Sequence, residues 1–132
     1  MKAKALWAGG YQSIVDDRRG HSVVNDLPAD FNGENNGATS LEMCTMSLAG
    51  CISTIFRMMA DKMKLSIDHF EVDVEAEKID GTIGKAVVAA KVKSSESKEK
   101  LEKAYKLTCD TCPVGVLFVK AGVEVTKTLE IL

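Results

Sequence analysis

Four cysteines are the residues of this chain with the most distinctive chemistry, at Cys44, Cys51, Cys109 and Cys112. In a reducing cytoplasm, which we expect for this protein, cysteines at this density point to thiol chemistry or metal binding rather than to structural disulfides. No glycine-rich phosphate loop is present, and no Ser-His-Asp set can be assembled from the order of the residues. The candidate chemistry is therefore that of thiols.

Cys109 and Cys112 form a C-x-x-C motif, which is found in redox pairs and as half of a zinc site. A zinc site needs a second pair of ligands, and the only histidines, His21 and His69, are isolated, so we expect no metal ion. A thioredoxin-like motif lies at the end of a strand and opens a helix, whereas here an amphipathic helix precedes it. If a new helix opens at Pro113, Cys112 occupies its N-cap, where free N–H groups stabilise a thiolate. We expect such a thiol to be reactive.

Cys51 lies in the middle of a long amphipathic pattern. Apolar or small residues recur at helical spacing at Leu41, Cys44, Leu48, Cys51, Ile52, Ile55 and Met59. Cys51 could be a small core residue, because free cysteine is often buried, or a nucleophile. Gly50 beside it is unfavourable inside a helix, which suggests close packing or ligand access at this point.

The helix that carries Cys51 begins with a capping box at Thr39-Ser-Leu-Glu42 and is expected to run to about residue 64. Glu42 can be explained by this cap alone, or it can have a second role in the site. Arg18 and Arg19, in the predicted turn at 17–20, are the only arginines that precede the helix in the sequence.

The other elements are expected to form antiparallel sheets. Alternation and turn residues predict strands at 2–8, 11–16 and 21–25, then a loop at 27–38, and a hairpin of strands 66–78 and 85–93. A second helix is expected after residues 94–97, and a last strand at 123–132, while 114–119 fits a strand or a short helix equally well. We predict one α+β domain over residues 1–132.

Composition excludes several function classes. With 17 basic and 19 acidic residues the net charge is -2, so nucleic acid is not the expected partner. Aromatic residues make up only 5%, which disfavours a surface that stacks bases. No signal peptide and no unbroken run of eighteen apolar residues is present, so we expect a cytoplasmic protein and no membrane partner.

Two spaced segments, 37–51 with its Leu-Ala-Gly-Cys step and 101–114 with its Cys-Pro-Val, resemble the OsmC/Ohr family of hydroperoxide-handling proteins. The resemblance implies an OsmC-like α+β fold with antiparallel sheets packed on a long central helix. It also implies an intertwined homodimer with sites at the interface, and reduction of peroxides by two cysteines at the expense of an external dithiol reductant. No cofactor is implied.

Carried over residue by residue, Cys51 resembles the peroxidatic cysteine, Cys112 the resolving cysteine, and Glu42 the carboxylate that orients an activating arginine. That arginine has no counterpart before the long helix, because Tyr11 follows the Gly-Gly step and the 27–38 loop contains none. The chain therefore resembles the subgroup that lacks the usual arginine. We take Arg19 as the candidate replacement.

Two hypotheses about function follow. The first is an oxidative-stress enzyme, a peroxiredoxin-type hydroperoxide reductase in which a Cys51 sulfenate is resolved by Cys112. The alternative is an OsmC-like protein that binds a small molecule or senses redox state, with little peroxidase turnover. The resemblance does not identify the peroxide or the reductant.

Overall fold

A computed structural model describes all 132 residues, which form two compact units, Met1–Cys44 and Thr45–Leu132. The first unit contains an antiparallel sheet of β1 (Lys4–Gly9), β2 (Gln12–Asp16) and β3 (Ser22–Asn25), followed by the short 3-10 helix η1 (Ala29–Phe31). The predicted meander is confirmed. Gly9 and Gly10 both have positive φ at the first turn, which glycine adopts without strain.

The loop between β3 and the long helix is held together by a buried carboxylate. Asp26 is only 1% exposed and accepts hydrogen bonds from the backbone N–H groups of Leu27, Glu34 and Asn36 at 2.7, 3.2 and 3.0 Å. These bonds, that from Asn36 first, lower the pKa of Asp26. The buried Asp26 carboxylate therefore holds the loop in place. The Asn- and Gly-rich composition of the loop did not indicate this role for Asp26.

Helix α1 (Ser40–Lys62) begins as the capping box predicts. The Thr39 N–H donates to Glu42 Oε2 at 2.7 Å, and the Glu42 N–H donates to Thr39 Oγ1 at 3.3 Å. These bonds lower the pKa of Glu42. By length and composition α1 could cross a membrane, but the core helix of a soluble protein meets the same test.

The second unit is built on a sheet ordered β4 (His69–Ile79), β5 (Thr82–Lys93) and β6 (Glu124–Ile131). β4 and β5 form the expected antiparallel hairpin, but β6 runs parallel to β5. The second sheet is therefore mixed, not wholly antiparallel as expected. A parallel pair needs a long crossover connection, and the two helices that link β5 to β6 supply it.

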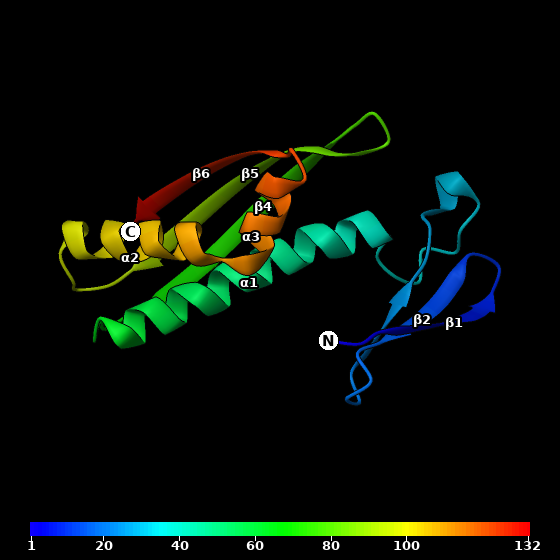
Figure 1. Cartoon of the computed structure of the whole chain (residues 1–132), viewed down its shortest axis with the longest axis horizontal. Helices are drawn as coiled ribbons and strands as arrows, with labels where there is room; N and C mark the ends of the chain where they lie inside the picture. Colours follow the sequence, from blue (N-terminus) through cyan, green and yellow to red (C-terminus); the bar gives the residue numbers. More distant parts are fainter. The chain divides into compact units, whose positions relative to one another are not determined.

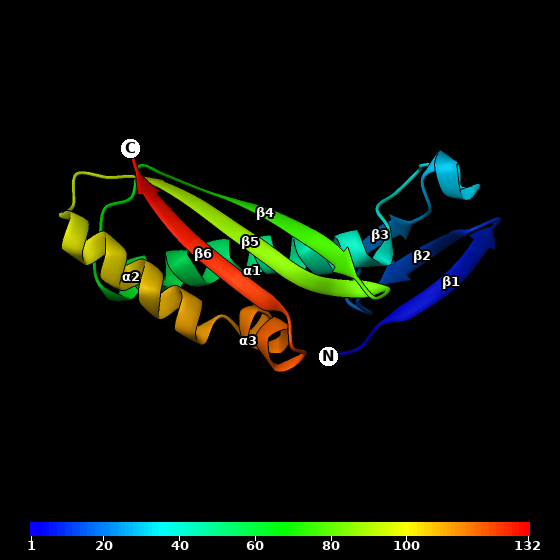
Figure 2. The same ribbon diagram turned by 90° about the horizontal axis from the view of Figure 1, so that it is seen from above.

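Helices α1 and α2 (Lys98–Thr111) lie on the same side of this sheet (Figure 2). Alternate residues of β5 face them and are buried, whereas Val87 on the other face is 47% exposed. Across the layers, the rings of Phe56 and Phe70 stack with centroids 3.8 Å apart. The core contains Leu48, Ile52, Phe56, Ala86, Val88, Ala90, Val92 and Leu101. Of the predicted helical stripe, Leu48 and Ile52 are in the core, and Cys51 and Ile55 are partly buried against it.

The segment that fitted either a strand or a short helix is a helix, α3 (Pro113–Lys120). Pro113 stands at its first position, where the missing N–H is not needed and the fixed φ suits a helix. In Figures 1 and 2 the junction of α2 and α3 lies beside the middle of α1. This junction positions Cys112.

Candidate active site

The second unit brings Cys51 and Cys112 together across 61 residues of sequence. Cys51 is half-buried in the middle of α1, and Cys112 is 1% exposed at the junction of α2 and α3. The Cys112 thiol donates to Cys51 Sγ with 2.9 Å between the two sulfur atoms. Both side chains are thiols, and a disulfide between them needs only a short further approach.

Cys112 occupies the N-cap of α3, as the position of Pro113 predicted. Its backbone is extended (φ -60°, ψ 113°), and its sulfur accepts a hydrogen bond from the Gly115 N–H at 3.3 Å. A Cβ at Gly115 would lie 3.5 Å from Cys112 Sγ and 3.9 Å from Leu48 Cδ1, which are ordinary contact distances.

The direction of the Cys112 pKa does not agree with the expectation that the N-cap stabilises a thiolate. Burial, followed by the hydrogen bond to Cys51, raises the pKa of Cys112 to about 11, and the Gly115 N–H only partly opposes this. Desolvation of the charged sulfur therefore outweighs one cap hydrogen bond. At neutral pH Cys112 is a protonated donor.

The other two cysteines lie elsewhere. Cys109 is buried in α2 at 9% exposure, and burial raises its pKa. Lys127 Nζ donates to the Cys109 backbone oxygen at 3.2 Å, so this residue is tied to β6. Cys44 is exposed near the start of α1. The structure thus pairs Cys112 with Cys51 and not with its neighbour in the C-x-x-C motif.

Gly50, next to Cys51, has no close neighbour in the chain, because a Cβ there would meet no heavy atom within 4 Å. Close packing inside the chain therefore does not explain this glycine. Two explanations for a glycine at position 50 are left, namely access of a ligand to the Cys51 thiol and packing against another molecule.

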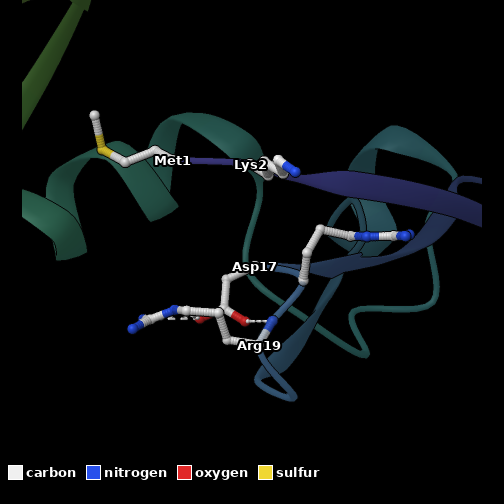
Figure 3. Close-up of a pocket in the computed structure, with 5 residues that line it drawn as sticks. Met1, Lys2, Asp17 and Arg19 are labelled. Atoms are coloured by element: carbon white, nitrogen blue, oxygen red, sulfur yellow. Dashed lines mark hydrogen bonds and ion pairs between the residues drawn. The ribbon is translucent and has the colours of Figure 1, made fainter.

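In the first unit, Arg19 and Glu42 are each engaged locally. Arg19 contacts Asp17 Oδ2 through Nε at 3.1 Å and through Nη2 at 3.0 Å, and its side chain is 77% exposed. Figure 3 shows this pairing at a surface pocket of about 560 Å³ lined by Met1, Lys2, Asp17, Arg18 and Arg19. Glu42 binds the cap of α1, so the structure does not bring these two predicted partners together.

No group of three or more His, Cys, Asp or Glu side chains is arranged to hold a metal ion. His21 Nδ1 lies 2.7 Å from Asp17 Oδ2, and His69 Nε2 lies 3.2 Å from Glu71 Oε2. Each histidine thus has a carboxylate partner in its own unit.

Sequence reasoning missed one feature of the candidate site, the hydrogen bond from Cys112 to Cys51. The only signal was indirect: Pro113 indicated an N-cap, and the apolar stripe indicated a buried face of α1. Neither specifies which thiol donates. The backbone N–H of Gly115 was predictable, because an N-cap side chain accepts from the second or third residue of its helix.

Comparison with known proteins identifies relatives of this fold. A family model described as "OsmC-like protein" matches residues 33–128. No curated protein is significantly similar to the chain.

Among solved structures, an OsmC-like protein from Mycoplasma pneumoniae superposes with a TM-score of 0.88 at 12% identity, covering 99% of this chain and 96% of that one. An organic hydroperoxide resistance protein OsmC from Legionella pneumophila superposes with a TM-score of 0.76 at 16% identity, covering 98% of this chain and 95% of that one. An organic hydroperoxide resistance protein from Elizabethkingia anophelis superposes with a TM-score of 0.77 at 16% identity, covering 98% of this chain and 94% of that one. At these identities the likeness establishes the fold.

Proposed function

The chain belongs to the OsmC-like protein family, and from this premise we propose that it reduces hydroperoxides with its thiols in a cytoplasmic defence against oxidative stress. Two of the structural relatives are named as organic hydroperoxide resistance proteins. The observation that carries the proposal is in the chain itself: Cys51 and Cys112 have sulfur atoms 2.9 Å apart. This is the arrangement that a peroxidatic and a resolving cysteine need.

In the proposed reaction, Cys51 as thiolate attacks the distal oxygen of a hydroperoxide and becomes a sulfenic acid, while an alcohol or water leaves. Cys112 then condenses with the sulfenic acid to a disulfide. An external dithiol reductant restores both thiols. The half-buried position of Cys51 supports its assignment as the residue that meets the peroxide, because Cys112 is almost wholly covered.

Mass spectrometry after one equivalent of organic hydroperoxide tests this proposal. We expect a disulfide between Cys51 and Cys112 within seconds, with Cys44 and Cys109 still reduced. Slow over-oxidation spread over several thiols would instead exclude the peroxidase reading.

A homodimer is part of the proposal, with the site completed at the interface between subunits. In its support, large apolar side chains of both units are exposed in the single chain, including Leu6, Trp7, Val23, Met58 and Leu117. In such a dimer Arg19 of either subunit could leave Asp17 for Cys51, with Glu42 as its carboxylate partner.

A second candidate function is a redox sensor or small-molecule binder with little turnover. It is favoured by one observation, namely that Arg19 is paired with Asp17 and Arg57, the one arginine of the second unit, with Asp61. Slow formation of the same disulfide without repeated turnover by added dithiol would support this candidate over the enzyme.

A further inference from the structure

The proposed reaction requires a proton when the O–O bond breaks. The oxygen that leaves an alkyl hydroperoxide would depart as an alkoxide, a strong base, and a positioned acid lowers the barrier to its departure. Within the unit Thr45–Leu132, the Cys112 thiol hydrogen-bonds Cys51 Sγ, with 2.9 Å between the two sulfur atoms. A peroxide that reaches Cys51 therefore arrives beside a proton donor.

We infer that Cys112 is the general acid of the oxidation step as well as the resolving nucleophile, and that giving up its proton is what prepares it to resolve. This inference rests on the proposed function. It assigns Cys112 a role before the sulfenic acid exists, whereas a resolving cysteine alone acts only afterwards.

The surroundings of Cys112 suit both roles. Before the reaction, burial raises the pKa of the thiol to about 11, so the proton is in place at neutral pH. Afterwards, the negative charge left on its sulfur faces the Gly115 N–H, 3.3 Å away at the N-terminus of α3. The residue is thus protonated while it donates and has a hydrogen-bond donor for its charge once it has done so.

Both steps conserve atoms and electrons. The Cys51 thiolate attacks the distal oxygen, an S–O bond forms, and the O–O bond breaks with its electron pair on the leaving oxygen. That oxygen takes the Cys112 proton and departs as alcohol, so Cys51 is oxidised to sulfenic acid and the peroxide is reduced. The Cys112 thiolate then attacks Cys51 Sγ, an S–S bond forms, and the S–O bond breaks. Hydroxide leaves and becomes water with a proton from solvent.

Two oxidants with different leaving groups separate this role from simple resolution. tert-Butyl hydroperoxide releases a strongly basic alkoxide that needs a proton, whereas peracetic acid releases acetate, which does not. The rate of sulfenic acid formation on Cys51 is measured by quenched-flow trapping with a sulfenate-specific dione and mass spectrometry. Wild type, Cys112→Ala and Cys112→Ser are compared, each checked for folding by circular dichroism. In wild type, where resolution competes with trapping, the trapped sulfenate and the disulfide are counted together.

We expect Cys112→Ala to slow the reaction with tert-butyl hydroperoxide by at least about tenfold and that with peracetic acid by less than about twofold. Cys112→Ser should restore most of the alkyl hydroperoxide rate, because its hydroxyl can donate and can cap α3.

If Cys112→Ala formed the sulfenic acid as fast as wild type with both oxidants, the inference would be overturned. Cys112 would then be a resolving residue only, and the proposed function would stay intact. Equal slowing with both oxidants would also overturn the inference, since that is the result of a structural defect. If wild type itself forms neither sulfenate nor disulfide with either oxidant, the proposed function fails, and the inference with it.

Discussion

The two thiols of the candidate site differ in exposure and in the direction of their shared hydrogen bond. Cys51 is half-buried and accepts, whereas Cys112 is covered and donates. Burial holds Cys112 in its thiol form despite its place at a helix N-terminus. Single substitutions should therefore affect the two residues unequally.

The first prediction concerns this division of labour. Cys51→Ser should abolish peroxide consumption, because the thiol that attacks the peroxide is removed. Cys112→Ser should consume about one equivalent and leave a trappable sulfenate on Cys51, since the sulfenic acid has no partner. Peroxide consumption with a dithiol reductant measures the loss of activity in Cys51→Ser. Consumption without reductant, followed by mass spectrometry, measures the single equivalent and the sulfenate in Cys112→Ser.

Cys44→Ser and Cys109→Ser are the matched controls and should keep turnover. Loss of disulfide formation in Cys109→Ser would show that Cys109 and Cys112 are the redox-active pair. That result would contradict the pairing of Cys51 with Cys112.

The second prediction concerns activation of Cys51. If Arg19 reaches this thiol, Arg19→Met should slow its alkylation at neutral pH by about tenfold, because a nearby positive charge favours thiolate. Glu42→Gln should slow it less and should weaken the α1 cap by about 0.5 kcal/mol, a value that salt reduces because Glu42 is exposed. Iodoacetamide kinetics measure the first effect and urea unfolding the second.

Arg18→Met, which removes the neighbouring guanidinium, is the control for Arg19→Met. Unchanged alkylation in both single variants and in the double variant would show that no arginine of the 17–20 turn activates Cys51, and Glu42 would remain a capping residue.

At the scale of elements, the first unit depends on its loop. Three N–H groups of the segment 27–36 converge on Asp26, and Gly37 packs so closely on β3 that a Cβ would lie 2.2 Å from the Val24 oxygen. These contacts fix the path from β3 into α1.

The third prediction is a pH dependence of this loop. The folded pKa of Asp26 is lowered, so its contribution to stability is complete above its unfolded pKa and is lost as pH falls through the folded value. Hydrogen exchange at the Asn36 N–H, measured from neutral to acid pH and corrected for intrinsic rates, should lose protection on acidification.

Asp26→Asn should remove most of that pH dependence and lower protection at neutral pH, because the amide replaces the charged acceptor. Asp30→Asn, at an exposed position of the same loop, should behave as wild type. If acid left the protection of the Asn36 N–H unchanged in wild type, the anchoring role of Asp26 would be excluded.

At the scale of the whole molecule, each unit has large apolar side chains that lie outside its core and are exposed. Trp7 is 72% exposed in the first unit and Leu117 is 64% exposed in the second. Surfaces of this kind are typical of chains that associate.

The fourth prediction is self-association. Sedimentation equilibrium at micromolar concentration should give about twice the chain mass of 14.3 kDa. Leu117→Lys should shift the equilibrium toward monomer if α3 lies in the interface, whereas Lys120→Glu at the exposed end of the same helix tests for a general charge effect. A monomeric wild type would exclude the interfacial site.

The sequence by itself determined the features that depend on neighbours in the chain. The capping box at Thr39 and Glu42, the meander and the β4–β5 hairpin follow from side-chain to backbone hydrogen bonds and from alternation over a few residues. Family resemblance supplied the pairing of Cys51 with Cys112, because no local pattern relates residues 61 positions apart.

The tertiary structure decided what depends on burial and on distant segments. Residues 114–119 fitted two local patterns, and in the structure they belong to helix α3, which precedes the parallel strand β6. Cys112 was expected to be a thiolate because its place at a helix N-terminus can be read from neighbouring residues. The desolvation that keeps the thiol protonated comes from the side chains packed around it. Electrostatics in a protein interior depend on everything that excludes water, which one segment of sequence does not specify.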